Sequence, residues 1–378
     1  MAVTVVIEEA SFASGAKLAG LVAHSIEQIE PVRLLLRDPG PLELWLTEHV
    51  HGPVEICNTG NFPYEASFAQ RCSAAKALLQ TDASDAVYIY GLGASDFAVA
   101  ARSQGRHVVL HAYQTGAQIE YLLARDQAKT DCAAFCDALV TAGTHSREAM
   151  SRLFGRTPAC VANVGMRVDV DWVRQAFSAP SPEVYNSAGG KLDWNSGFVV
   201  GGAGSAERGA AFVVSLAQEC PDIPFVWIGA DRLPHADNRP GGGILDRGLS
   251  NLYAMTDGDN EFPSLAGLGA WVVCGGETGV TLPLAAAAMG IPVVGFSTAG
   301  MAALLGRYGI LCHGDPAPSL VRDVLGKLAA ESPSPAMQDT DARWRQLDVG
   351  GAVDSVLQVL ADVRLMEPDA TGTGAPGS

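Results

Sequence analysis

Three glycine-containing segments carry residue types suited to binding a phosphate or a sugar. They are SFASGA at residues 11–16, GGAGSAERG at 201–209 and GGETGVT at 275–281, and each separates an apolar run from a helical pattern. The first N–H groups of a helix lack partners within the helix, and its dipole adds positive charge there, so such junctions bind anions. We therefore predict ligand contacts at Ser14 and Gly15; an ordinary strand-to-helix turn is the alternative.

The second and third segments add charged side chains. Arg208 lies where the second segment opens a helix, so its guanidinium and the amide of Gly202 predict a local anion site. This segment matches neither GxGxxG nor a Walker motif. In the third, Glu277 can accept hydrogen bonds from sugar hydroxyls while the amides of Thr278 and Gly279 face the ligand. A turn with a surface arginine, and a glutamate that only complements the helix dipole, are the alternatives.

His111 directly follows an apolar strand pattern in VVLHAYQTG, residues 108–116. Ligands of open α/β sheets bind at the carboxyl ends of the strands, so we expect this imidazole to face the ligand. A neutral imidazole can hydrogen-bond a sugar hydroxyl or the reacting centre, and it can exchange a proton near neutral pH. A structural histidine at a strand end is the alternative.

Metal sites are not expected. The pairs Asp169 with Asp171 and Asp257 with Asp259 have Asp-x-Asp spacing, but neither pair ends a clear strand. Such spacing arises by chance among 41 acidic residues, and a hard cation needs several convergent oxygens. The eight cysteines include no CxxC pair, which predicts reduced cytoplasmic thiols.

The chain alternates apolar runs with helical patterns, which predicts parallel, doubly wound sheets. Strands are predicted at 3–7, 32–36, 54–57, 86–90, 108–110, 138–141, 198–200, 225–228, 271–274 and 293–296. A proline is tolerated only in the first turn of a helix, so Pro283 predicts a helix that begins within 279–282.

The length of 378 residues predicts two domains at about 150 residues each. A Pro-, Gly- and Ser-rich stretch without periodicity marks the expected linker. The predicted parts are a first domain at 1–177, a linker at 178–197, a second domain at 198–347, a helix at 348–366 that we expect to pack back on the first domain, and a disordered tail at 367–378.

The composition excludes several classes of protein. With 25 basic and 41 acidic residues the net charge is −16, which argues against a broad surface that binds nucleic acid. Glu8 and Glu9 interrupt the first apolar run, so it indicates a strand rather than a signal peptide. No run reaches about 18 apolar residues, so no transmembrane segment is expected and we predict a cytoplasmic protein.

The order and spacing of these segments resemble the retaining GT-B glycosyltransferases of the large family (glycosyltransferase family 4-like) that includes sucrose synthase, glycogen synthase and lipid-glycan mannosyltransferases. Glu207, Arg208 and Gly209 match the family's Glu-Lys-Gly, and Glu277 with Gly279 and the run AAAAMGIPVVGF is similar to its donor-sugar signature. The other parts of the resemblance are the glycine-rich loop at Ser14 and Gly15, the histidine at His111, and residues 138–166, which resemble the end of the family's first domain.

Two positions depart from the family pattern. Ala203 stands where the family usually has a diphosphate-binding arginine, and Ala285 stands where it has a second, ribose-binding glutamate. Each missing charge-assisted hydrogen bond usually costs about 1.5–3 kcal/mol. Ordinary donor binding therefore requires compensation from other residues.

The resemblance implies an α/β protein of GT-B architecture, with two Rossmann-like domains facing an interdomain cleft. It implies a hexosyltransferase that moves sugar with retention from a nucleotide sugar, UDP- or GDP-linked, to a small-molecule or peptide acceptor, without a metal or other cofactor. Arg208 and the amides at Gly15, Gly202 and Gly279 would stabilise the departing diphosphate. Glu277 would orient the donor hydroxyls, His111 would contact the sugar, and Thr278 and Thr281 would bind the donor.

Two alternatives stay open at this stage. Ala203 and Ala285 fit a noncatalytic pseudoenzyme or partner protein that keeps the fold and has lost its affinity for the donor. A sugar-nucleotide epimerase of GT-B architecture would instead convert the donor without any acceptor.

Overall fold

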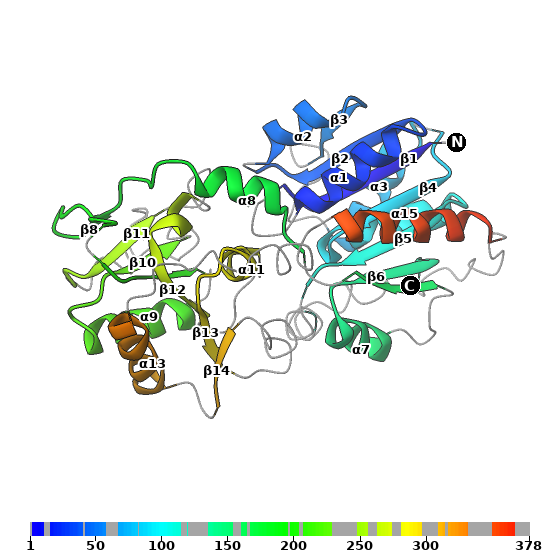
Figure 1. Ribbon diagram of the computed structural model, residues 1–378. Coiled ribbons are helices and arrows are strands. Elements are labelled where there is room, and N and C mark those ends of the chain that lie inside the picture. Colours follow the sequence, from blue (N-terminus) through cyan, green and yellow to red (C-terminus); the bar gives the residue numbers. More distant parts are fainter. Residues whose placement is uncertain are drawn as a thin grey trace. The chain divides into compact units, whose positions relative to one another are not determined.

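The computed structural model divides the chain into two compact units (Figure 1). The first unit contains Met1–Arg167 and Val349–Ser378, and the second contains Val168–Asp348. The residues described are 2–10, 16–40, 42–57, 67–81, 83–114, 119, 135–153, 160–164, 167–195, 197–203, 207–228, 248–255, 263–273, 281–296, 309–313, 317–331 and 350–366. The predicted disordered tail lies outside these ranges.

The first unit is built on a parallel sheet with strand order β3-β2-β1-β4-β5-β6-β7. Its elements are β1 (Val3–Glu9), α1 (Ala16–Glu27), β2 (Val32–Asp38), α2 (Glu43–His49), β3 (Val54–Ile56), α3 (Phe68–Leu79), β4 (Ala86–Tyr90), η1 (Leu92–Ala94), α4 (Ser95–Ser103), β5 (His107–Ala112), β6 (Ala138–Thr141), α7 (Thr144–Leu153), β7 (Cys160–Asn163) and α15 (Gly350–Arg364). Central strands such as AVYIY in β4 are buried along their whole length, as parallel strands covered on both faces must be.

The second unit repeats this architecture with strand order β14-β13-β12-β9-β10-β11-β8. Its elements are α8 (Val170–Phe177), β8 (Tyr185–Asn186), β9 (Val199–Ala203), α9 (Glu207–Glu219), β10 (Phe225–Ile228), β11 (Leu252–Met255), η4 (Pro263–Gly267), β12 (Leu268–Val273), α11 (Thr281–Ala288), β13 (Val293–Phe296), β14 (Gly309–Cys312) and α13 (Pro318–Glu331). All its strand pairs are parallel except β11 with β8. The predicted α/β class is therefore confirmed.

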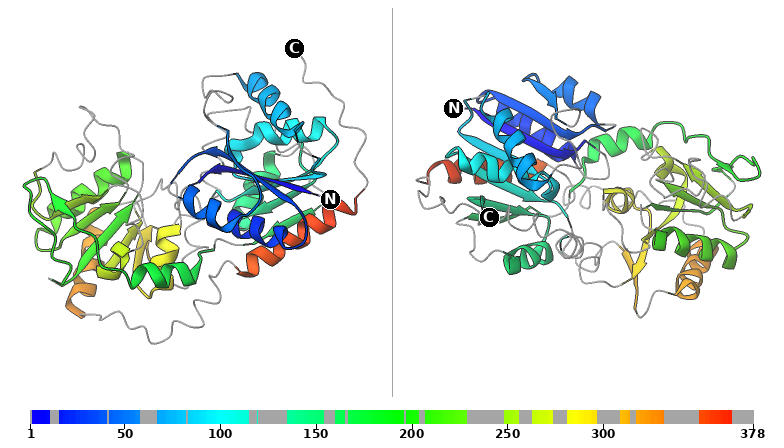
Figure 2. Two further views of the ribbon diagram at one scale, coloured as in Figure 1. Left: turned by 90° about the horizontal axis from the view of Figure 1, so that it is seen from above. Right: turned by 180° about the vertical axis from the view of Figure 1, so that it is seen from behind.

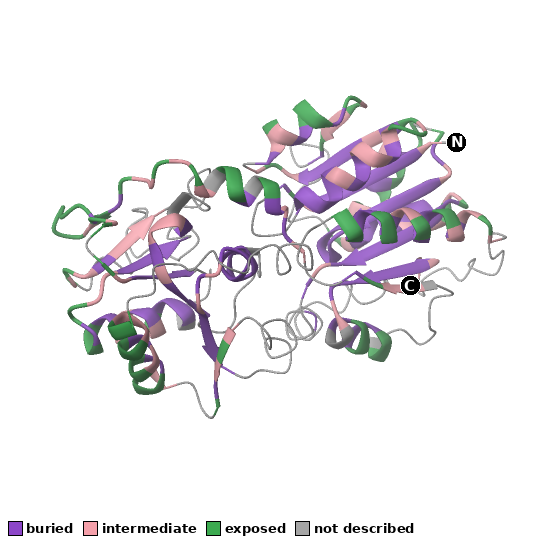
Figure 3. Ribbon diagram, viewed as in Figure 1, coloured by how far each residue is buried: buried purple, intermediate pink, exposed green. Residues whose placement is uncertain are grey.

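Each unit has its own apolar core between sheet and helices (Figure 3). In the first unit, Phe97 of α4 packs among residues of β4 and β5. In the second, Trp227 of β10 packs with Val213 of α9 and Leu325 of α13. Figure 3 shows buried strands and helices that expose one face, the pattern of an amphipathic helix on a buried sheet.

The last described helix, α15, belongs to the first unit although it follows the second unit in sequence. It contacts α1 and strands β4–β7, and Figure 2 shows it (red) beside α1 (blue). Its buried residues recur at helical spacing: Ala352, Val353, Val356, Val359, Leu360 and Val363. Arg364 at its end forms an ion pair with Glu30, donates to Asp85 Oδ1 at 2.9 Å, and donates to the carbonyl of Ala2 at 3.3 Å.

The described cysteines include buried thiols in both units, among them Cys57, Cys220 and Cys312. Burial raises the pKa of Cys57 to about 11, which keeps its thiol protonated at neutral pH. Among the helices that the structure describes, none combines the length and apolar character needed to cross a bilayer.

Replacement of Arg364 tests how α15 is held. Arg364→Ala leaves Glu30 and Asp85 without this cation, so we expect a loss of about 2 kcal/mol in the free energy of unfolding of the first unit, measured by urea denaturation. Arg322→Ala is the control, because that side chain is 46% exposed and pairs with Asp323 and Glu219 at the surface. The control should cost less than about 1 kcal/mol. Equal losses in the two variants would contradict the anchoring role of Arg364.

Candidate functional site

In the second unit, the topology brings two of the predicted segments to one edge of the sheet. Strand β9 lies between β12 and β10, and Gly202 of β9 is in register with Val272 of β12. The chain leaves β9 toward β10 on one side, whereas it leaves β12 toward β13 on the other. Right-handed crossovers then place α9 and α11 on opposite faces, so a topological switch point lies between β9 and β12.

The starts of two helices lie at this switch point. Helix α9 begins at Glu207 and Arg208, and α11 begins at Thr281, each after the carboxyl end of its strand. Their first-turn amides are suited to binding an anion. The topology thus brings together the backbones of Gly202, Arg208 and Thr281, from segments separated in the sequence. The predicted residues Ser14, Gly15, Glu277, Thr278 and Gly279 lie outside the described residues, and their roles stay predictions.

The glycines of β9 also have a packing role. A Cβ at Gly201 would lie 2.5 Å from the Leu268 side chain, and a Cβ at Gly202 would lie 3.4 Å from Val213 of α9. A methyl group at Gly202 would make ordinary van der Waals contact with Val213, whereas one at Gly201 would require the Leu268 side chain to shift. Gly201 therefore allows β9 to lie close to Leu268 of β12.

Helix α11 presents small residues to its surroundings. Ala285 is fully buried within it, as are its neighbours Ala286 and Ala288. Ala285 is the position at which the resembled family has its second glutamate. The methyl group provides no hydrogen-bond acceptor for a ribose there.

In the first unit, His111 lies near the end of β5 and is 1% exposed. Its Nδ1 atom is 2.6 Å from the hydroxyl of Tyr88 on the neighbouring strand β4. The ring of Tyr90 meets the imidazole edge-on, with 4.8 Å between ring centroids. Two tyrosines of the neighbouring strand β4 therefore hold the imidazole in one orientation.

Burial lowers the pKa of His111 to about 3 from its ordinary value of 6.5. Desolvation disfavours the imidazolium, so the ring is neutral at physiological pH. Of the two roles predicted from the sequence, this favours a hydrogen-bonding imidazole over one that exchanges a proton near neutral pH. The direct contact with a sugar stays a prediction.

Burial of His111 contributes to the pH dependence of the free energy of unfolding, and this contribution can be tested. The unfolded chain protonates this imidazole near pH 6.5 while the folded chain does so only near pH 3, so its contribution to stability is complete above pH 6.5 and is lost as the pH falls. Asparagine can hydrogen-bond to Tyr88 without titrating. We expect the stability advantage of the wild type over His111→Asn to shrink by about 2 kcal/mol from pH 7 to pH 5 in urea denaturation. Parallel stability profiles of the two proteins would refute a buried neutral imidazole.

The switch point of the first unit lies between β1 and β4, which are neighbours although the chain leaves them toward opposite sides of the sheet. Glu8, near the end of β1, packs against two glycines: a Cβ at Gly91 would lie 2.6 Å from Glu8 Cβ, and one at Gly93 would overlap Glu8 Oε1. Gln114 donates to Glu8 Oε2 at 3.3 Å. The sequence signal that points to this group is Gly-Leu-Gly directly after a buried strand. The motifs predicted from the sequence did not include it.

A buried ion-pair network lies at the same edge of this sheet. Asp96, at the start of α4 and 1% exposed, is 3.4 Å from Arg37 of β2 and 3.6 Å from Arg71 of α3. Burial raises the pKa of Asp96, and the two arginines oppose this shift. The network ties α3 and α4 to the end of β2.

Searches of protein-family models and of curated proteins found no match to this sequence. Solved structures do match over nearly the whole chain. HepE from Anabaena, in complex with UDP-glucose, aligns with a TM-score of 0.69 and 15% identity, covering 96% of this chain and 100% of HepE. The chain has the GT-B fold.

Two further solved structures are similar to this chain over nearly its whole length. A glycosyltransferase from Rickettsia africae aligns with a TM-score of 0.67 and 9% identity, over 96% of this chain and 98% of that one. UDP-GlcNAc 2-epimerase from Neisseria meningitidis, bound to UDP-GlcNAc, aligns with a TM-score of 0.60 and 12% identity, over 96% and 100%. At these identities the similarity shows the fold alone, and activity must be argued from the residues.

Proposed function

We propose that this protein is a retaining glycosyltransferase that moves a sugar from a nucleotide-sugar donor to a small-molecule or peptide acceptor. The observation that carries the proposal is the switch point of the second unit, where Gly202 and the starts of α9 and α11 share one sheet edge. That edge is where open α/β sheets bind nucleotides. Similar structures hold UDP-glucose or UDP-GlcNAc, so a UDP-sugar is the proposed donor.

The proposed chemistry is electrostatic. As the bond between sugar and diphosphate breaks, negative charge accumulates on the leaving group. We assign its stabilisation to the Arg208 guanidinium and to the amides of Gly15, Gly202 and Gly279. Preorganised donors of this kind do not need a metal, and the absence of a metal requirement is part of the proposal. The protein is proposed to act in the cytoplasm.

The sugar itself would be held by other residues of the predicted set. Glu277 accepts hydrogen bonds from donor hydroxyls, and Thr278 and Thr281 complete the donor contacts in this proposal. His111 contributes a neutral imidazole beside the sugar, which fits the burial that lowers its pKa to about 3. On the acceptor side, Gln114 is a candidate contact, because its Oε1 atom is buried without a hydrogen-bond partner among the described residues.

Two competing functions have specific support. The epimerase with UDP-GlcNAc shares the fold over nearly the whole chain, so conversion of the donor without an acceptor is the second candidate. Fully buried Ala285, in place of a ribose-binding carboxylate, supports a protein that has lost its donor affinity. The experiments below separate the three.

Donor binding should depend on Arg208. We expect UDP-glucose to bind in isothermal titration calorimetry, and Arg208→Ala to weaken binding by roughly 10- to 100-fold through loss of a charge-assisted bond of about 1.5–3 kcal/mol. The matched control is Arg322→Ala, which removes a surface arginine from α13 of the same unit. A dissociation constant that Arg208→Ala leaves unchanged would remove this residue from the site.

Proton NMR can distinguish a retaining transferase from an epimerase. Incubated with UDP-glucose, a retaining transferase should release or transfer glucose that is α-configured when first observed, because the donor linkage is α. Conversion of UDP-GlcNAc at C2 without an acceptor would identify an epimerase instead. Failure to bind any donor of a UDP- and GDP-sugar panel, with an intact circular dichroism spectrum, would leave the noncatalytic protein as the explanation.

A further inference from the structure

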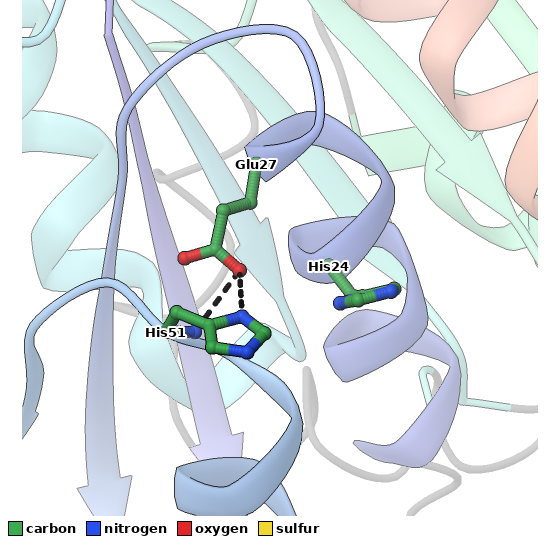
Figure 4. A group of neighbouring side chains, drawn as sticks. All are labelled: His24, Glu27 and His51. Atoms are coloured by element: carbon green, nitrogen blue, oxygen red, sulfur yellow. Dashed lines mark hydrogen bonds and ion pairs between the residues drawn. The ribbon is translucent and has the colours of Figure 1, made fainter.

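Three metal-ligating side chains converge in the first unit (Figure 4). His24 and Glu27 lie one turn apart on α1, and His51 follows the end of α2. One ligand atom of each lies within 4.8 Å of the others. Both α1 and α2 end where the chain turns back into β2 and β3, so the cluster lies at the amino-terminal edge of the sheet, opposite the edge of His111 and Glu8.

The His24 ring is oriented as metal-ligating histidines usually are. Its Nδ1 atom is 2.9 Å from the backbone carbonyl of His49. A carbonyl only accepts, so Nδ1 carries the proton and donates, which leaves the lone pair of Nε2 available. Second partners of this type fix the tautomer and orientation of histidines in metal centres.

Glu27 is held in place by the chain that enters β3. Its carboxylate accepts hydrogen bonds from the amides of His51, at 3.0 Å, and of Gly52, and from the His51 ring at 3.1 Å. These hydrogen bonds fix the position of the carboxylate, which faces an imidazole that is 75% exposed.

We propose that His24, Glu27 and His51 form a binding site for a divalent transition-metal ion, with zinc as the expected occupant. Two imidazoles and a carboxylate are a ligand set typical of zinc, whereas magnesium and calcium prefer oxygen ligands alone. Zinc ligand atoms at about 2.0–2.1 Å from the ion lie roughly 3.3 Å apart, so binding would draw these three atoms, which lie within 4.8 Å of one another, closer together. Water completes the coordination.

The bound ion would join two segments that no covalent bond connects. The end of α1 carries two ligands, and the connection from α2 to β3 carries the third. Because the ion binds this arrangement and not the unfolded chain, it stabilises the first unit by mass action. The site has no part in the proposed transfer reaction, which is assigned to other residues.

To test the proposal, the full chain is first treated with a chelator to remove bound metal. Zinc chloride is then titrated into it in an isothermal titration calorimeter. The wild type should bind one equivalent, and His24→Gln and His51→Gln should each weaken binding by more than about tenfold. His49→Gln is the matched control: it keeps the carbonyl that orients His24 and changes a ring hydrogen-bonded to Trp45 instead. Calcium chloride should give no binding.

Two further measurements test the proposal even if a variant misfolds. Circular dichroism reports the fold of each variant, and the visible absorption of cobalt-loaded wild type reports nitrogen and oxygen ligands without any substitution. The proposal is overturned if the wild type binds no zinc at sub-millimolar concentration. It is equally overturned if folded His24→Gln and His51→Gln bind zinc as the His49→Gln control does. Neither result bears on donor binding, so the proposed transferase function is tested separately.

Discussion

Parallel strand pairing is the constraint on which both candidate sites depend. When strands run in the same direction, all their carboxyl ends share one edge of the sheet, and every connection must cross back over a face. Reversal of the strand order at β1 and β4, and again at β9 and β12, gives each sheet a topological switch point, the place at which open α/β sheets bind ligands. Glu8, His111 and Gly202 come to these edges through topology rather than through their own side-chain interactions.

The fold could be predicted because its central strands carry an unambiguous signal. Ala86–Tyr90 is a continuous apolar run, Val3–Ile7 is apolar except for Thr4, and both form strands buried on both faces. Pro283 lies in the first turn of α11, which begins within the predicted interval. Strands β7, β8, β11 and β14 were not predicted: each has four residues or fewer, so none shows an apolar run strong enough to stand out.

The candidate sites were only partly predictable. A motif search finds residues that are close in the sequence, such as the segment around Arg208. The Glu8 group instead joins the end of β1 to Gly91 and Gly93 after β4, and only the pairing of those strands brings them together. The proposed zinc ligands likewise come from α1 and from the connection between α2 and β3, with Glu27 and His51 separated by 24 positions. The neutral state of His111 depends on burial, which a strand pattern indicates but does not measure.

The placement of α15 has a consequence for how the chain matures. The hydrogen bond from Arg364 to the carbonyl of Ala2 joins residues 362 positions apart, so the first unit is interrupted by the whole of the second. A ribosome completes the continuous second unit while the sheet of the first still lacks its covering helix. Until α15 docks, the apolar surface that it later shields beside α1 is open to water, which gives the newly made protein an interval of exposure to chaperones and to aggregation.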